Sequence, residues 1–219
     1  MQFDNSLNSF CVLLIVDIYL IRHGESEANR DKIAQGWLDS PLSELGRKQA
    51  RNLQKELPDN YDRVYSSPLL RAKETALLGL GISEENERIE FMDDLREINI
   101  GLLEGVHFAE IDVSEENRRK WSNLQVDTLT KKYNTEPIEH FMKRTSMAFD
   151  KIINTSKENN RKVILIFSHG GTMRSIVTQK LHLITPEDSR IANTEIFQIK
   201  YQASKWTLEG RSKEHVIFE

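Results

Sequence analysis

Short apolar runs punctuate the chain and predict its strands. Two of them are rich in Val, Ile and Leu and have the length of buried strands, and two more are shorter. The four runs lie at 12–21, 62–66, 89–92 and 163–168. Near the end of the chain, 195–201 and 205–208 predict a closing hairpin at a sheet edge.

Amphipathic stretches separate these runs and predict helices. The clearest stretches cover 43–57, 68–78, 138–156 and 170–183, and a polar stretch at 115–132 is also predicted to be helical. Strands that alternate with helices predict an α/β fold, a three-layer α/β/α sandwich with a mostly parallel central sheet.

The helix over 43–57 carries the strongest local signals. Ser43 has the residue type of an N-cap, and Pro58 would stop the helix. Its predicted buried stripe consists of Leu45, Ala50, Leu53 and Leu57.

Composition narrows the classes of protein that the chain can be. Its 219 residues fit one domain, predicted over 17–219 with a helical insertion near 106–161, after an N-terminal extension over 1–16. With 34 acidic and 30 basic residues the net charge is −4, so we expect no nucleic-acid or membrane partner. The single cysteine, Cys11, excludes an intrachain disulfide and fits a cytoplasmic location.

Chemically capable side chains follow each predicted strand of the parallel sheet. Arg22 and His23 follow the first, Arg71 comes after the second, Glu97 after the third and His169 after the fourth. The carboxyl ends of parallel strands meet at one edge, where ligands bind in open α/β sheets. We therefore expect these five side chains to share one site.

The set suits phosphoryl transfer. Arg22, Arg71 and His169 can neutralise the three equatorial oxygens of a transferring phosphoryl group. A neutral imidazole at His23 can attack phosphorus, and Glu97 can protonate the leaving oxygen and later activate water. A metal site with two histidines and a carboxylate is the competing interpretation. We consider it weaker because the arginines would repel a cation and no HxH, HExxH or DxD spacing occurs.

At these positions the sequence resembles the histidine phosphatase superfamily, the phosphoglycerate mutase-like proteins. The resemblance runs from about residue 17 to about residue 201, and the matching segments are 20–29, 35–46, 66–75, 95–105 and 168–171. It implies that His23 is the phosphohistidine nucleophile, that Arg22, Arg71 and His169 form the phosphate pocket, and that Glu97 is the proton donor.

The resemblance also implies contacts on the substrate side. The residues concerned are Ser26, Asn29, Gln35, Gly36 and Gly170. It implies no metal and no organic cofactor for the phosphatase branch of the family.

The spacing of the motifs bears on the choice between hydrolysis and transfer. The similar mutases carry a long insertion between the acid and the second histidine, and here that gap is 169 − 97 = 72 residues. We therefore expect a metal-independent phosphomonoester hydrolase that acts on a small metabolite resembling a phosphoglycerate or a sugar phosphate. A cofactor-dependent phosphoglycerate mutase and a non-catalytic phosphate-binding scaffold remain the alternatives.

Substrate choice is expected to depend on the insertion. Arg118, Arg119 and Lys120 could bind a second anionic group, although a solvated helix face explains them more simply. The sequence leaves the oligomeric state open, a homodimer included.

Overall fold

A six-stranded sheet forms the centre of the computed structural model, which describes residues 15–111, 128–186, 188 and 190–212. The strands are β1 (Val16–Arg22), β2 (Arg63–Ser66), β3 (Ile89–Phe91), β4 (Val163–Ser168), β5 (Ile196–Gln202) and β6 (Lys205–Arg211). Their order in the sheet is β3-β2-β4-β1-β5-β6. β3, β2, β4 and β1 are parallel, whereas β5 runs antiparallel to β1 and forms a hairpin with β6.

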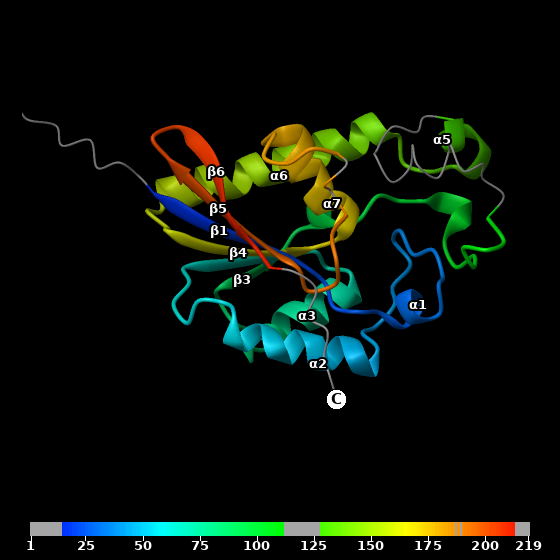
Figure 1. Cartoon of the computed structure of the whole chain (residues 1–219), viewed down its shortest axis with the longest axis horizontal. Helices are drawn as coiled ribbons and strands as arrows, with labels where there is room; N and C mark the ends of the chain where they lie inside the picture. Colours follow the sequence, from blue (N-terminus) through cyan, green and yellow to red (C-terminus); the bar gives the residue numbers. More distant parts are fainter. Residues whose placement is uncertain (1–14, 112–127, 187, 189, 213–219) are drawn as a thin grey trace, which may run out of the picture.

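Helices cover both faces of this sheet. They are α1 (Glu27–Arg30), α2 (Glu44–Asn52), α3 (Leu70–Leu80), α5 (Thr128–Tyr133), α6 (Ile138–Glu158) and α7 (Gly170–Arg174). The short 3₁₀ segments are η1 (Leu53–Lys55), η2 (Asp93–Leu95) and η3 (Gly101–Leu103), and η4 (Ser175–Lys180) is a π-helical turn. α6 and α7 lie on one face, and α2 and α3 lie on the other (Figure 1). The predicted three-layer α/β/α sandwich is confirmed.

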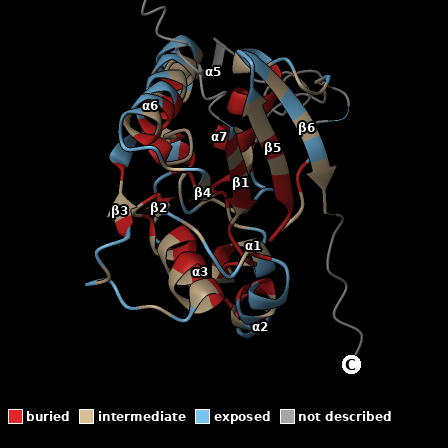
Figure 2. Cartoon of the chain, turned by 90° about the vertical axis from the view of Figure 1, so that its left-hand side faces the viewer, coloured by how far each residue is buried: buried red, intermediate tan, exposed pale blue. Residues whose placement is uncertain are grey.

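Side-chain alternation along β1 explains the two-sided core. Ile18 and Leu20 pack into a cluster with Phe149 and Ile152 of α6. Ile21, one position on, points to the opposite face and packs with Leu53 beside α2. Buried residues accordingly form a layer on each side of the sheet (Figure 2).

The register of the strands brings the carboxyl ends of β1, β2 and β4 to the same edge of the sheet. Arg22, the last residue of β1, lies opposite Ser168 at the end of β4, and Ser66 of β2 lies opposite Phe167. The segments that follow these three strands therefore start from neighbouring positions at one edge of the sheet.

The buried face of α2 differs from the predicted stripe. Ser43 is the N-cap, as predicted, and its Oγ accepts a hydrogen bond from the Gly46 amide at 3.0 Å. Leu45, however, is 40 % exposed, so its place in the stripe was predicted wrongly. The other three residues of the stripe, Ala50, Leu53 and Leu57, are buried as predicted, and Gly46 joins the buried face because it packs directly on the backbone of Glu25.

One helix ends earlier than expected, and some predicted features cannot be compared. The helix that starts at Gly170 ends at Lys180, before the predicted end at 183, and its last turn is closed by a π-type bond from the Leu181 amide to the Ile176 carbonyl. The predicted features at 1–14 and at 112–127, including Arg118, Arg119 and Lys120, lie outside the described residues. Within the part that is described, none of the helices has the length and apolar character needed to cross a bilayer.

Candidate active site

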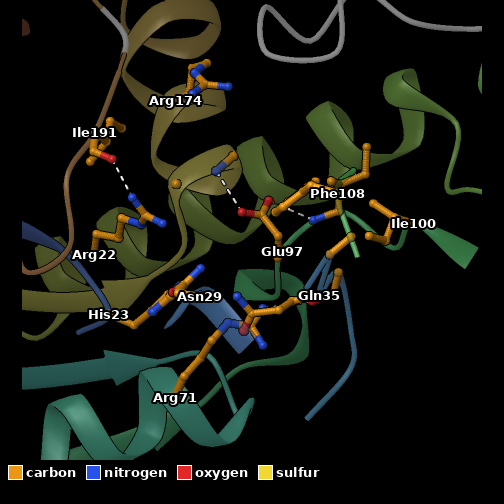
Figure 3. Close-up of a pocket in the computed structure, with 15 residues that line it drawn as sticks. Arg22, His23, Asn29, Gln35, Arg71, Glu97, Ile100, Phe108, Arg174 and Ile191 are labelled. Carbon is orange, nitrogen blue, oxygen red and sulfur yellow. Dashed lines mark hydrogen bonds between the residues drawn. The ribbon is translucent and has the colours of Figure 1, made fainter. Parts of the chain in front are cut away.

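A pocket of about 260 Å³ opens where β1 and β4 end. Most of the residues singled out from the sequence line it, and Figure 3 shows several of them converging on one space. Those that line the pocket are Arg22, His23, Asn29, Gln35, Gly36, Arg71, Glu97 and Gly170. His169 lies beneath the surface of the pocket and Ser26 stands behind it, and both side chains are fully buried.

His23 is held in one tautomer by its own loop. Its Nδ1 lies 2.7 Å from the carbonyl oxygen of Gly24. A carbonyl oxygen can only accept a hydrogen bond, so Nδ1 carries the hydrogen and the neutral ring keeps its lone pair on Nε2. Burial, reinforced by the charges of Arg71 and Arg22, lowers the pKa of His23 well below its ordinary value. The ring is therefore neutral near pH 7.

The loop that carries His23 is fixed from behind by α3 and α2. The Gly24 amide donates to Thr75 Oγ1 at 3.0 Å, and this hydroxyl donates to the Arg71 carbonyl at 2.6 Å. A Cβ on Gly24 would lie 2.7 Å from the carbonyl oxygen of Gly46 in α2. Glycine at both positions thus allows the loop and the helix to meet backbone to backbone.

Two arginines, Arg71 buried and Arg22 partly buried, supply positive charge beside His23. Arg71, 1 % exposed, donates to the carbonyl oxygens of Gly36 at 2.8 Å and Leu38 at 3.0 Å. Arg22 donates to the Ile191 carbonyl at 2.5 Å. Burial lowers the pKa of Arg71 to about 10, so it stays charged at neutral pH. The Nε atoms of both guanidinium groups have no hydrogen-bond partner within the described residues, which suits an anionic ligand.

His169 adds a second buried imidazole next to His23. Its Nε2 is 2.8 Å from Ser67 Oγ, and its ring centroid is 5.2 Å from that of His23. Burial, followed by the charge of Arg71, lowers its pKa well below the ordinary value. Among the described residues, no three His, Cys, Asp or Glu side chains are grouped so that they could hold a metal ion.

Glu97 faces the pocket from the segment after β3. Its Oε1 accepts the Ile98 amide at 2.9 Å and its Oε2 accepts the Gly171 amide at 2.8 Å. A Cβ on Gly171 would lie 2.1 Å from Oε1, so only glycine leaves room for the carboxylate at this place. Gly171 therefore positions the predicted proton donor.

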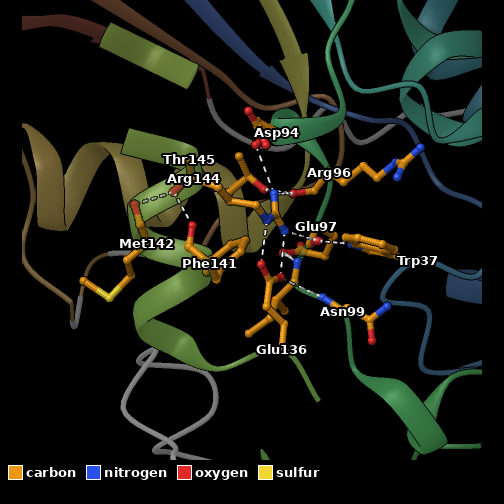
Figure 4. A network of polar contacts seen from close by, with 12 residues as sticks. Trp37, Asp94, Arg96, Glu97, Asn99, Glu136, Phe141, Met142, Arg144 and Thr145 are labelled. Carbon is orange, nitrogen blue, oxygen red and sulfur yellow. Dashed lines mark hydrogen bonds and ion pairs between the residues drawn. The ribbon is translucent and has the colours of Figure 1, made fainter. Parts of the chain in front are cut away.

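Arg144 of α6 holds the backbone of the Glu97 segment, and the sequence analysis missed it. Its guanidinium donates to the carbonyl oxygens of Asp94, Arg96 and Glu97 at 3.0, 2.9 and 2.7 Å (Figure 4). Glu136 pairs with the same guanidinium at 2.7 and 2.8 Å. Both side chains of this ion pair are largely buried, at 16 % and 13 % exposure.

The loop that carries Gln35 and Gly36 is tied to the same segment. Trp37 Nε1 donates to the Glu97 carbonyl at 2.7 Å, and the Trp37 amide donates to Glu104 Oε1 at 2.8 Å. Glu104 also accepts the Ile100 amide at 3.3 Å. Trp37 and Glu104 are not among the described residues that line the pocket. Their role is to hold the loop in place.

Ser26 serves the site indirectly. Its Oγ caps α1 by accepting the Asn29 amide at 3.1 Å and donates to Gln35 Oε1 at 2.7 Å. Asn29 closes the capping box through its Oδ1, which accepts the Ser26 amide at 3.3 Å. The predicted contact of Ser26 with substrate stays a prediction, and its position is that of a support for Asn29 and Gln35.

The pocket lining adds residues that the sequence analysis did not select. They are Ala34, Ile98, Ile100, Phe108, Gly171, Arg174 and Ile191. Arg174 could have been found, because it lies four residues after Gly170 in a helical stretch and so on the same face. Ile98, Ile100 and Phe108 carry no comparable signal, since apolar residues outside a periodic element usually pack in the core.

Comparison with known proteins places the chain in a family. The sequence pattern of the histidine phosphatase superfamily (branch 1) matches residues 18–213. "Putative phosphoserine phosphatase 2" of Hydrogenobacter thermophilus is 37 % identical over 164 residues, which cover 73 % of this chain and 76 % of that protein. "Metal-independent phosphoserine phosphatase" of Arabidopsis thaliana is 28 % identical over 202 residues, with coverage of 90 % and 82 %.

Solved structures agree with this placement. The phosphoglycerate mutase from Bacillus anthracis superposes with a TM-score of 0.77 at 29 % identity, covering 90 % of this chain and 92 % of that one. The alpha-ribazole phosphatase from Shigella flexneri superposes with a TM-score of 0.72 at 28 % identity, with coverage of 89 % and 95 %. From its sequence pattern, its fold and its relatives, the chain belongs to the histidine phosphatase superfamily.

Proposed function

We propose that the protein hydrolyses phosphomonoesters of small metabolites through a phosphohistidine on His23, without a metal ion. The observation that carries the proposal is the tautomer of His23. Its Nδ1 hydrogen is donated to the Gly24 carbonyl, which leaves the Nε2 lone pair for attack on phosphorus. Relatives named as phosphatases, one of them as metal-independent, support this proposal.

The first step transfers the phosphoryl group to the enzyme. His23 Nε2 forms a bond to phosphorus while the ester P–O bond breaks, and the leaving alkoxide takes a proton from Glu97. Arg22 and Arg71 balance the charge on the equatorial oxygens of the phosphoryl group, because cations that are buried or partly buried interact with charge more strongly than fully solvated ones.

The second step releases phosphate. Glu97, now a carboxylate, accepts a proton from water as the water oxygen attacks phosphorus. The P–N bond breaks, the pair of electrons returns to Nε2, and inorganic phosphate leaves with neutral His23 restored. The amides of Ile98 and Gly171 hold the carboxylate in one place for both proton transfers.

Trapping the intermediate tests the mechanism. A rapid quench of the wild-type enzyme with a labelled ester should yield protein-bound phosphate that is labile in acid and stable in alkali. His23→Ala should lose this label and nearly all turnover while its circular dichroism is unchanged. Turnover of the folded variant at the wild-type rate would exclude His23 as the nucleophile, and activity abolished by a chelator would favour a metal-dependent route.

Transfer to a second hydroxyl is the alternative, and the similarity to a solved phosphoglycerate mutase favours testing it. Incubation of labelled 2-phosphoglycerate should release inorganic phosphate if hydrolysis is the reaction. Label that appears in 3-phosphoglycerate without phosphate release would identify a mutase. Binding of phosphate without either reaction would identify a scaffold.

A further inference from the structure

The two sides of the pocket differ in chemistry. Arg22 and Arg174 stand on one side of Glu97, and Phe108 and Ile100 stand on the other (Figure 3). We call the second side the apolar wall and define it as Ala34, Ile98, Ile100 and Phe108. Within the described lining of the pocket, the wall contains no charged side chain.

The apolar wall is the outer surface of a small separate core. Ala34 and Ile100, 1 % and 5 % exposed, belong to a hydrophobic cluster with Leu103 and Ile111, and Ile98 packs against it. This cluster lies apart from the two larger clusters on the faces of the sheet. The wall is therefore already packed before a ligand binds, so its side chains lose little conformational entropy on binding.

Phe108 differs from the other members because it is 52 % exposed. Its backbone is fixed, since its amide donates to the Lys32 carbonyl at 2.9 Å and the neighbouring His107 forms a bridge with Ile33. An anchored aromatic ring that lines a pocket and stays half exposed can gain contact area when a ligand covers it.

The direction of the reaction leads the leaving group to this wall. In an in-line displacement the leaving oxygen departs on the side of phosphorus opposite the His23 Nε2. The proton donor stands beside the leaving oxygen, so the alcohol part of the substrate extends past Glu97, away from Arg22. The side chains that it meets there are those of Ile98, Ile100 and Phe108.

We propose that the apolar wall binds the alcohol part of the substrate, and that the enzyme prefers phosphate monoesters of apolar, flat alcohols to those of polyols or amino acids. This inference rests on the proposed function. It replaces the expectation of a phosphoglycerate-like or sugar-phosphate-like substrate, because hydroxyl and carboxylate groups would lose their hydration against hydrocarbon without a partner on the wall.

Kinetics on matched esters test the preference. Benzyl phosphate, glycerol phosphate and O-phosphoserine all release an alkoxide, so differences in leaving-group activation are small. The wild type should show kcat/KM about tenfold or more higher for benzyl phosphate, the range expected for a well-packed apolar contact. Equal values, or a preference for glycerol phosphate or O-phosphoserine, would overturn the inference while leaving the hydrolase proposal standing.

Variants at the wall locate the effect. Phe108→Ala should lower kcat/KM for benzyl phosphate about tenfold and change that for glycerol phosphate less than about twofold, and Phe108→Leu should retain most of the preference. Leu102→Ala is the matched control, because Leu102 is 71 % exposed in the adjacent η3 and does not line the pocket. A loss of equal size on both esters in Phe108→Ala would overturn the role of the wall.

A binding measurement separates this inference from the reaction itself. Phenylethylphosphonate and ethylphosphonate have a C–P bond and are not hydrolysed. Calorimetry should show phenylethylphosphonate binding about tenfold tighter to the wild type, and Phe108→Ala should remove that difference. Equal affinities for the two phosphonates would overturn the proposed role of the apolar wall even if esters are hydrolysed. Tighter binding of phenylethylphosphonate without hydrolysis of any ester would support the wall and refute the hydrolase proposal.

Discussion

Two glycines, Gly24 and Gly171, allow close packing at the site because they have no Cβ. Gly24 gives room to the backbone of Gly46, and Gly171 gives room to the carboxylate of Glu97. Neither glycine has a positive φ, so the absence of a Cβ explains both positions without unusual dihedrals.

Gly171→Ala should therefore damage acid catalysis. The new Cβ would lie 2.1 Å from Glu97 Oε1, so the carboxylate must move and loses the bond from the amide of residue 171. We expect kcat to fall about tenfold to a hundredfold for esters of poorly leaving alcohols, and less for an activated aryl ester, because general-acid catalysis contributes about 10²–10⁴-fold. Steady-state kinetics on an alkyl and a nitrophenyl ester measure the difference.

Gly210→Ala is the matched control for this prediction. Gly210 lies in β6, and a Cβ there would meet Gln198 Oε1 at an ordinary 3.5 Å. Its activity on both esters should match the wild type. If Gly171→Ala also keeps wild-type activity on the alkyl ester, the position of the Glu97 carboxylate is not needed for the reaction.

At the scale of elements, α6 does more than cover the sheet. Its Arg144 holds three backbone carbonyls of the segment that ends at Glu97, and Glu136 balances its charge. Because this segment is otherwise short 3₁₀ structure and turns, these bonds connect the predicted proton donor to a helix of 21 residues. We regard Arg144 as a positioning residue, since it does not line the pocket described.

Arg144→Ala should lower both activity and stability. Loss of one partner leaves Glu136 charged and largely buried, which costs about 3 kcal/mol of unfolding free energy, as for other buried pairs. We expect kcat to fall about tenfold with little change in KM, because proton donation weakens while the phosphate pocket stays intact. Urea titrations and steady-state kinetics at one pH give the two quantities.

The double variant Arg144→Met with Glu136→Met separates the two effects. It removes the unpaired charge, so it should recover part of the stability. The three carbonyls remain unheld, so kcat should stay low. Recovery of kcat together with stability would show that Arg144 acts on folding alone and has no part in placing Glu97.

The sequence predicted the site residues that follow strand ends and the helices that show a clear periodicity. It missed contacts between segments that lie far apart in the sequence. His23, Arg71 and Glu97 could be grouped because they follow parallel strands whose ends are in register. Arg144 could not, because nothing near it in the sequence shows that α6 crosses the Glu97 segment 47 residues away. Leu45 was misplaced for a related reason, since nothing near it in the sequence shows that its neighbour Gly46 packs on the backbone of Glu25.

At the scale of the whole molecule, the site is built into the core. His23 and His169 are 3 % and 0 % exposed at the point where the sheet meets the helices of both layers. Burial, with the charges of Arg71 and Arg22, lowers both pKa values well below 6.5. The unfolded chain therefore binds protons on these two side chains at a pH at which the folded chain does not.

This difference predicts that stability falls in mild acid. When the pKa of a group is lower in the folded chain than in the unfolded chain, protons bind more tightly to the unfolded chain. Protonation therefore favours unfolding once the pH drops below the pKa of the unfolded chain, and the free energy of unfolding rises with pH in that range. Both histidines contribute in the same direction, so the free energy of unfolding should fall as the pH drops from about 7.5 to about 5.5, through the ordinary pKa of histidine. Urea titrations followed by tryptophan fluorescence at these two pH values measure the change.

The variant His23→Asn with His169→Asn isolates the two histidines from every other titrating group. It should be less stable than the wild type at neutral pH, because buried hydrogen bonds are lost. Its unfolding free energy should nevertheless fall less than that of the wild type over the same pH interval, because the groups responsible are gone. If both proteins lose stability in parallel, the histidines gain their protons as readily in the folded as in the unfolded chain. The lowering of the two histidine pKa values by burial and by the neighbouring arginines would then be refuted.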